Sequence, residues 1–421
     1  MSAIKSEANA ALDVAACRRQ FSALRRDFGG RPGVYFDGPA GSQVPTRVID
    51  AMVDYMTVRN ANHGGLFPTS RESDQMLDGA RAAAADLLGT DSPRSIVFGA
   101  NMTTLTFALS RALSKTWNPG DEILVTELDH DANFTPWVLA ARDAGAVVKR
   151  VRVRPEDCTL DLEDLQAKLS PRTRLVAVGC ASNAVGTVNP VAEVVTLAHK
   201  VGALVFLDAV HYAPHRLMDV RGWGCDFLAC SAYKFFGPHV GILWGREELL
   251  ESLPAYKVRP ASNEIPDRWM TGTQNHEGIA GALAAVEYLA DLGGHASGGV
   301  SRRQAIEQAF ARINDYEAQL ARHLLDGLAR LKQVRVWGIT DTARLAQRVP
   351  TFGVAHASLS ATDLATRLGE QGIFVWHGNF YAQPLTEALG LEPAGLVRIG
   401  LLHYNTTEEI DRLLAALAAF E

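Results

Sequence analysis

The sequence predicts an α/β protein with a mostly parallel sheet in a large domain and a smaller α+β domain at the C-terminal end. Between about residues 33 and 245, short β-branched apolar runs alternate with stretches of helical periodicity, which is the pattern of βαβ units. The runs are apolar on consecutive residues, as in strands that helices cover on both faces. After the glycine-rich segment 293–299 the pattern changes to one long helical stretch followed by shorter elements.

Seven apolar runs are the predicted strands of the large sheet. They are Ser95–Phe98, Glu122–Thr126, Val147–Val153, Leu175–Gly179, Leu204–Leu207, Phe227–Cys230 and Gly241–Trp244. Between them, apolar residues recur at helical spacing. The helices predicted there are Thr103–Ser114, Pro136–Ala144, Leu162–Leu169 and Val191–Val201.

The C-terminal part begins with a long amphipathic stretch, Ser301–Leu331, which predicts a helix. Two further helices and four short strands follow, the strands at Val334–Trp337, Thr351–Ala355, Ile373–Trp376 and Val397–Gly400. We therefore expect an N-terminal arm at residues 1–33, a large domain at 34–292 and a small domain at 293–421.

Composition excludes several classes of protein. The chain has 421 residues with 41 Lys and Arg against 47 Asp and Glu, a net charge of −6, so neither nucleic acid nor an anionic membrane is an expected partner. No apolar run approaches the ~20 residues of a membrane span, and the N-terminus lacks a secretion signal, so we expect a cytoplasmic protein. Its five cysteines show neither metal-site spacing nor a disulfide pattern, so we expect free thiols and no metal.

Polar residues follow four of the predicted strands, at the edge where open parallel sheets bind ligands. These are Asp129-His130-Asp131, Ser182-Asn183, Asp208 with His211, and Ser231-Ala232-Tyr233-Lys234. A carboxylate that follows an apolar strand, such as Asp208, is partly desolvated and needs a cationic partner. Lys234 can lose its proton in such a crevice and attack a carbonyl carbon.

Together these residues match what pyridoxal phosphate requires. Thr103 and Thr104 open a predicted helix, where hydroxyls and free N–H groups can bind phosphate. A nucleophilic lysine, a strand-end aspartate and a histidine supply a covalent partner, a counter-ion for the pyridinium nitrogen and a ring to stack on. Taken singly, each has a plainer interpretation: Asp208 and Thr103 can cap helices, and Lys234 can extend its ammonium group to solvent.

From Val34 to its C-terminus the chain resembles the class V aminotransferase family of fold-type I pyridoxal-phosphate enzymes, and within it the Suf-type cysteine desulfurases. The segments that carry the resemblance are Tyr35 to Ala40, Asp129 to Asn133 with Pro136-Trp137, Ser182 to Thr187, Asp208 to His211, Ser231 to Lys234, Gly272-Thr273 and Val397-Arg398. The resemblance implies the fold of a fold-type I pyridoxal-phosphate-dependent transferase. It also implies that an amino acid is the substrate.

The resemblance assigns a role to each candidate residue. Lys234 would hold the cofactor as a Schiff base, Asp208 would pair with the pyridinium nitrogen, and His130 would stack on the ring. The other implied cofactor-binding residues are Met102, Thr103, Asn183, His211, Ser231, Tyr233 and Thr273. Thr273 would come from the neighbouring subunit of a homodimer with shared active sites. The implied substrate-binding residues are Ala40, Asn183, Tyr381 and Arg398, the last suited to a bidentate contact with the α-carboxylate.

The chain departs from the desulfurases at several positions. His211 stands where many relatives have glutamine, and Tyr233 where histidine is usual. More important, the loop cysteine that attacks the substrate sulfur is replaced by Tyr381, and an arginine before that loop by Trp376.

These departures favour C–S lyase chemistry by elimination, without a persulfide cysteine. The alternatives are an aminotransferase, an amino-acid epimerase and a non-catalytic protein that binds pyridoxal phosphate. A nicotinamide-dependent oxidoreductase is disfavoured because no G-x-G-x-x-G follows the first strand.

Overall fold

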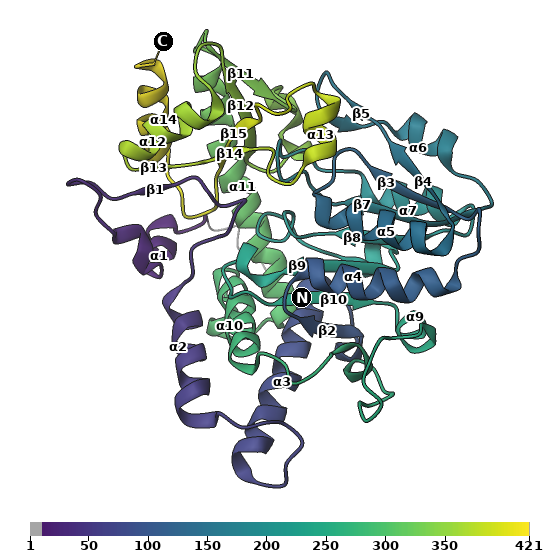
Figure 1. The fold of residues 1–421 in the computed structure, drawn as a ribbon. Coiled ribbons are helices and arrows are strands. Elements are labelled where there is room, and N and C mark those ends of the chain that lie inside the picture. The colour runs from purple at the N-terminus through teal and green to yellow at the C-terminus, as the bar shows by residue number, and fades with distance from the viewer. Residues whose placement is uncertain (1–10, 421) are drawn as a thin grey trace, which may run out of the picture.

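The computed structural model describes residues 11–420 and contains a seven-stranded sheet beside a four-stranded sheet (Figure 1). The large sheet has the strand order β2-β10-β9-β8-β7-β3-β4. Its strands are β2 Ile96–Gly99, β3 Glu122–Thr126, β4 Val147–Val151, β7 Thr173–Gly179, β8 Leu204–Asp208, β9 Phe227–Ser231 and β10 Gly241–Gly245. Only β10 runs antiparallel to its neighbours; the other pairs are parallel. The predicted fold class is therefore confirmed.

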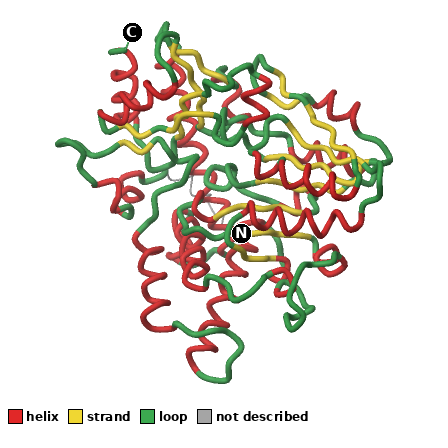
Figure 2. Tube along the Cα trace, viewed as in Figure 1, coloured by secondary structure: helices red, strands yellow, loops and turns green. Residues whose placement is uncertain are grey.

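Helices cover both faces of the large sheet (Figure 2). Alternate strand residues enter different cores, as Phe98 and Val97 do in β2, because successive side chains of a strand point to opposite faces. The core on one face includes residues of α4 Met102–Leu113 and α5 Thr135–Ala144. The core on the other face includes residues of α3 Pro68–Leu88, α6 Leu162–Lys168, α7 Val191–His199, α10 His276–Leu292 and α11 Arg302–Leu328.

The small sheet is antiparallel with the order β11-β12-β15-β14. Its strands are β11 Val334–Trp337, β12 Thr351–His356, β14 Trp376–Gly378 and β15 Leu396–Gly400, and its core includes residues of α11, α12 Ala361–Glu370 and α14 Thr407–Ala418. The N-terminal strand β1 Val34–Tyr35 pairs in parallel with β13 Ile373–Phe374. This pairing brings the segment after Tyr35 to the space between the two sheets, where Asp37 bridges to Gly400.

Three details differ from the sequence-based prediction. The run Val147–Val153 forms two strands, β4 and β5 Val153–Arg154, and Ile373–Trp376 divides into β13 and β14, which pair with different partners. The C-terminal part has a third helix, α13 Gln383–Ala388. The two strands divide because one continuous apolar run pairs with two different partners. The helix α13 is too short to give a periodic signal in the sequence.

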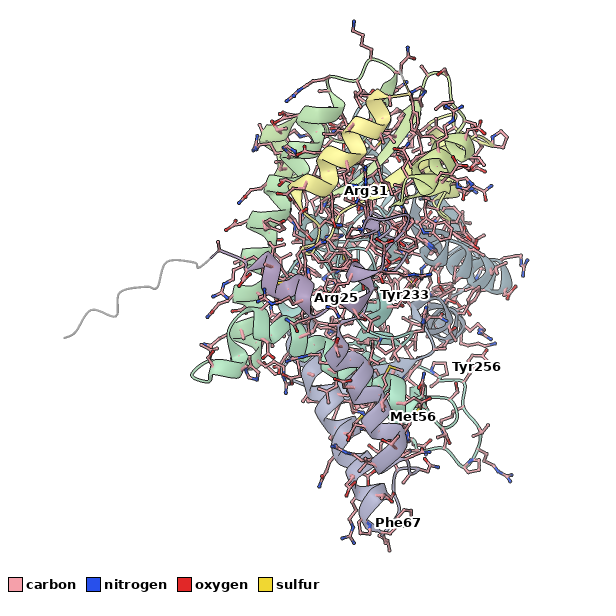
Figure 3. All side chains as sticks on the ribbon, turned by 90° about the vertical axis from the view of Figure 1, so that its left-hand side faces the viewer. Arg25, Arg31, Met56, Phe67, Tyr233 and Tyr256 are labelled. Carbon is pink, nitrogen blue, oxygen red and sulfur yellow. The ribbon has the colours of Figure 1, made fainter. Side chains whose placement is uncertain are left out.

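Two helices, α2 Thr46–Asp54 and α3, project from the body of the molecule (Figure 1). Met56 and Phe67 lie on this projection, with Phe67 near its tip (Figure 3). Across residues 11–420, no helix combines the length and apolarity that a membrane span needs. The division of the chain at residues 33 and 292 stays a prediction.

Candidate active site

A cavity of about 910 Å³ lies at the carboxyl-end edge of the large sheet and is closed on one side by residues of the small sheet. Twelve of the predicted site residues line it. They are Ala40, Met102, Thr103, His130, Asn183, Asp208, His211, Ser231, Tyr233, Lys234, Tyr381 and Arg398. Thr273 is exposed, lies just before α10 and is not among the residues that line this cavity.

Lys234 ends a single 3₁₀ turn that follows β9, and its side chain is buried. Its Nζ donates hydrogen bonds to the backbone carbonyls of Pro39 and Ala40. Burial, together with the Arg398 charge, lowers the pKa of the amine to about 7 against the opposing effect of Asp208. A large fraction of the amines is therefore neutral and nucleophilic at neutral pH.

Asp208 is the last residue of β8 and is buried. Its Oδ1 accepts the backbone N–H of Val210 at 2.9 Å, and no helix begins there, so the helix-cap interpretation is wrong. Burial raises the pKa of the carboxyl group to about 6, while the Val210 hydrogen bond and Lys234 oppose the rise. A buried carboxylate at the cavity wall is stabilised by a cation placed opposite it.

A second carboxyl group, Asp129, lines the same cavity. It accepts hydrogen bonds from the Thr126 hydroxyl at 2.8 Å and from the Gly179 N–H. Burial, with the nearby Asp208 charge adding to its effect, raises the pKa of Asp129 to about 7 against the hydrogen bonds from Thr126 and Gly179. Because these contacts tie Asp129 to two strand ends, it shapes the edge of the sheet beneath the cavity.

His130 is held in one tautomer. Its Nδ1 accepts the Ala132 N–H at 3.0 Å, which leaves the proton of the neutral ring on Nε2. Burial, together with the charges of Lys234 and Arg398, lowers the pKa of His130 to about 4, so the ring is neutral at pH 7. The Tyr381 ring stacks against it with centroids 5.5 Å apart.

The small sheet supplies Thr351 and Arg398 to the site. His211 Nε2 lies 3.0 Å from Thr351 Oγ1, and Arg398 Nη1 donates to the Asn183 carbonyl at 3.0 Å. Asn183 Nδ2 donates to the Phe380 carbonyl at 2.8 Å. Asn183 Oδ1 and Arg398 Nε are buried without a hydrogen-bond partner. Since buried polar atoms are normally satisfied, these two atoms fit a site that is completed by a ligand.

The N-terminus of α4 opens into the cavity. Asn101, rather than Thr103, caps this helix, because its side chain accepts the Thr104 N–H at 2.9 Å. The Thr103 side chain is thus free of the capping role that the sequence left open. Ser231 Oγ accepts the Met102 N–H at 2.9 Å. Hydroxyl groups beside a helix N-terminus form a cradle that suits a phosphate.

His239 also lines the cavity and stacks on Tyr233 with ring centroids 4.9 Å apart. No sequence pattern singles out His239 as a site residue. His239 lies two residues before β10, the one antiparallel strand, whose start lies at the edge where the parallel strands end. Knowing that β10 runs antiparallel would have placed His239 at the ligand-binding edge of the sheet. The apolar pattern of a single strand does not reveal the direction in which that strand runs.

Residues 376–381 form the outer wall, and all six line the cavity. Phe380 and Tyr381 both have a backbone φ of 58°, and residues other than glycine rarely adopt positive φ. Two contacts hold the loop: the Asn183 hydrogen bond to the Phe380 carbonyl, and the Asp131 N–H, which donates to the Tyr381 carbonyl at 2.7 Å. Backbone strain of this kind persists where surrounding contacts fix the conformation.

The five cysteines all lie within residues 11–420, where the structure describes them as free and buried. None of them lines the cavity. Burial raises the pKa of Cys17 and of Cys158 to about 11, and it raises the pKa of the other three thiols further. Buried thiols of high pKa are protonated and unreactive at neutral pH.

Comparison with known proteins identifies the family. The Aminotransferase class-V family model matches residues 34–413. The chain belongs to this family. A probable cysteine desulfurase from Synechocystis sp. is 33% identical over 419 residues, which are 96% of this chain and 95% of that protein.

Solved structures agree with the assignment to the family. The cysteine desulfurase CsdA from Escherichia coli, in its S-sulfonic acid form, has a TM-score of 0.83 and 28% identity over 97% of this chain and 98% of that chain. The apo cysteine desulfurase from Thermococcus onnurineus has a TM-score of 0.83 and 27% identity, covering 92% of this chain and 94% of that chain.

Class-V aminotransferases depend on pyridoxal phosphate, and it is the cofactor of this chain, which is an enzyme. The residues that surround the cavity fit this group. A buried amine, a buried carboxylate and a helix N-terminus lined by hydroxyls are within one cavity, and they match an aldehyde, a pyridinium nitrogen and a phosphate. The unpartnered Asn183 Oδ1 provides a further polar contact for the ring substituents or the substrate.

Proposed function

We propose that this enzyme is a lyase that cleaves the C–S bond of a sulfur-containing amino acid by elimination. The observation that carries the proposal is the combination of Lys234, Asp208 and Arg398 around the cavity with Tyr381, rather than a thiol, on its loop. The names of the relatives support a sulfur-containing substrate. The burial of all five cysteines supports a reaction without a protein-bound persulfide.

Arg398 is suited to bind the α-carboxylate of the substrate. Its guanidinium is buried, contacts the Asn183 carbonyl through Nη1 and has an unpartnered Nε. A buried guanidinium gains most from an anion that forms two parallel hydrogen bonds with it. A carboxylate fixed there would leave the α-carbon within the cavity that Lys234 and Asp208 also line.

When bound, pyridoxal phosphate supplies an electron sink for the bonds at the α-carbon of the substrate. Lys234, which would hold the cofactor, is also suited to take the proton from the α-carbon through Nζ. Its pKa of about 7 is appropriate for a general base at neutral pH. The Asp208 carboxylate would keep a proton on the pyridine nitrogen. His130, neutral at pH 7, contributes a flat face and an N–H rather than a charge.

The elimination balances without an oxidant. The Cα–H bond and the Cβ–S bond break, sulfur leaves with the bonding electron pair and takes up a proton, and the remainder reacts with one water. Cysteine would thus give sulfide, pyruvate and ammonia. A desulfurase reaction would instead move sulfane sulfur to a thiolate and leave alanine, and a phenol such as Tyr381, with a reference pKa of ~10, is a poor sulfur nucleophile.

A homodimer with shared sites is part of the proposal. Thr273 is exposed and lies outside its own cavity, as expected for a residue that contacts the phosphate of a neighbouring subunit. Ile49, Val53 and Met56 are exposed at helical spacing on α2 and its continuation. An apolar stripe of this kind is typical of a surface that another protein covers.

Product analysis tests the proposed reaction. The purified holoenzyme is incubated with cysteine, and sulfide, pyruvate, ammonia and alanine are measured, with Lys234→Ala as the control for enzyme-independent release. We expect equal amounts of sulfide, pyruvate and ammonia. Alanine in place of pyruvate would show desulfuration, keto acid without sulfide would show aminotransfer, and the D-isomer would show epimerisation; each of these results contradicts the proposal.

A further inference from the structure

Trp376 lies directly beside the arginine that is suited to the substrate carboxylate. In the antiparallel pair of β14 and β15, Trp376 is the direct partner of Arg398. Residues that face each other across an antiparallel pair point to the same side of the sheet. The indole and the guanidinium are therefore neighbours on one face, and both line the cavity.

The Trp376 indole has an unused face. Its side chain is 51% exposed, and among residues 11–420 the structure gives it neither a stacked ring nor a hydrogen bond. By contrast, Trp137 is fully buried and donates to Asn133 Oδ1 at 2.9 Å. A half-exposed indole at a cavity wall can offer a large flat apolar surface at little cost in conformational entropy.

The neighbouring residues extend this surface. Phe380 lies under the Arg398 guanidinium, with 4.4 Å between the guanidinium carbon and the ring centroid. Tyr381 is 72% exposed and stacks on His130. The wall next to the carboxylate-binding arginine therefore includes the aromatic rings of Trp376, Phe380 and Tyr381. Cysteine, whose side chain ends at the sulfur atom, has no group that would stack on them.

We propose that the substrate is an S-substituted cysteine whose sulfur carries a flat aromatic or heteroaromatic group, directly or through a methylene, and that Trp376 binds this group by stacking. The inference rests on the proposed elimination and specifies its substrate class. The reaction keeps the same balance: the Cα–H and Cβ–S bonds break, the aromatic thiol leaves with the electron pair and a proton, and one water completes pyruvate and ammonia.

The test compares S-benzyl-L-cysteine with S-methyl-L-cysteine. In both compounds the substituent on sulfur begins with an sp³ carbon, so the two departing thiolates are comparable leaving groups. Pyruvate release gives kcat/KM, and the absorbance change of the holoenzyme on titration gives Kd for each compound. We expect kcat/KM and affinity to favour the benzyl compound by about ten-fold, the scale of an aromatic contact plus the apolar area it buries.

Three variants separate stacking from a general effect on the fold. Trp376→Ala should abolish the preference for the benzyl compound, and the cofactor absorbance and circular dichroism of the variant report that it is folded. Trp376→Phe should keep most of the preference for the benzyl compound, because phenylalanine retains an aromatic face. Tyr256→Ala removes an equally exposed aromatic residue that does not line the cavity and should change neither value.

The outcomes distinguish this inference from the proposed reaction. Equal kcat/KM and Kd for the two compounds, or a benzyl preference that survives Trp376→Ala, would overturn the role of Trp376. If neither compound releases pyruvate but the benzyl compound binds more tightly in a Trp376-dependent manner, the elimination is refuted while the aromatic binding site stands.

Discussion

The Lys234 amine lies where burial outweighs the attraction of Asp208, so its pKa falls to about 7 from its ordinary value. Above this pH the neutral amine predominates, whereas an ordinary lysine, with a pKa of ~10.4, remains protonated. We therefore expect the rate at which the apoprotein attaches pyridoxal phosphate to rise as pH increases through about 7 and to level off near pH 8. Stopped-flow absorbance measures this rate. A rate that still rises steeply toward pH 10 would mean that Lys234 has an unperturbed pKa.

Asp208 provides a second test at this scale. Asp208→Asn keeps the shape of the side chain but cannot hold a proton on the pyridine nitrogen by charge. We expect the variant to bind the cofactor and to lose turnover by about 100-fold or more, the scale of an essential proton-transfer partner. Cofactor content and kcat are measured together, with the exposed Asp143→Asn as the control. Wild-type turnover in Asp208→Asn would remove the assigned role.

Individual site residues were predictable from the sequence where a buried strand ends in a polar residue. Asp208 and Lys234 follow long apolar runs, so their placement at one sheet edge needed only the parallel-sheet rule. His239 could not be found in this way, because it precedes an antiparallel strand. The contact of Arg398 with Asn183 and the pairing of Trp376 with Arg398 depend on how two separate sheets meet, which no local pattern encodes.

At the scale of elements, a buried pair joins α11 to the turn segment that follows β8. Glu317 Oε2 lies 2.9 Å from His215 Nδ1, and the two side chains are almost fully buried. Burial raises the pKa of Glu317, and His215 opposes the rise. The His215 ring packs edge-on against His211 of the active site at 5.4 Å, so this pair also supports the cavity wall.

Removing one member of such a pair leaves the other buried without its partner. We expect Glu317→Ala to lower the free energy of unfolding by about 3 kcal/mol, measured by urea denaturation of the holoenzyme. Glu307→Ala, on the same helix but about half exposed and paired with Arg303, should change it by less than about 1 kcal/mol. Equal changes in the free energy of unfolding would show that the buried pair stabilises the fold no more than the exposed pair does.

Elements were predictable to the extent that each had its own periodic pattern. The strands of the large sheet could be placed because both of their faces are buried, which gives continuous apolar runs. The pair β13 and β14 could not be resolved, since one apolar run, Ile373–Trp376, serves two different sheets. The helices α2, α3 and α10 were not assigned individually, and α3 packs on α10 where the small residue Gly79 faces Leu283, which gives a weak periodic signal.

For the whole molecule, the exposed apolar stripe on α2 and the position of Thr273 lead to a test of assembly. We expect a homodimer by light scattering at micromolar concentration, and we expect the double variant Val53→Glu with Met56→Glu to shift it toward monomer, because two charges would be buried without partners. The dimer should also bind the cofactor more tightly than the monomer, since Thr273 would be supplied by the neighbour. A monomeric wild-type protein with full cofactor occupancy is the result that this proposal cannot accommodate.

In the proposed elimination, carbon–sulfur cleavage proceeds without transfer of sulfur to a cysteine of the chain. The most direct measurement is mass spectrometry of the holoenzyme quenched with an alkylating reagent during cysteine turnover, with peptides mapped for all five cysteines. We expect every cysteine to be recovered as an unmodified or alkylated thiol while sulfide accumulates in solution. A stoichiometric persulfide on any one of them would contradict the account, because a thiol would then reach the substrate sulfur despite its burial in this structure.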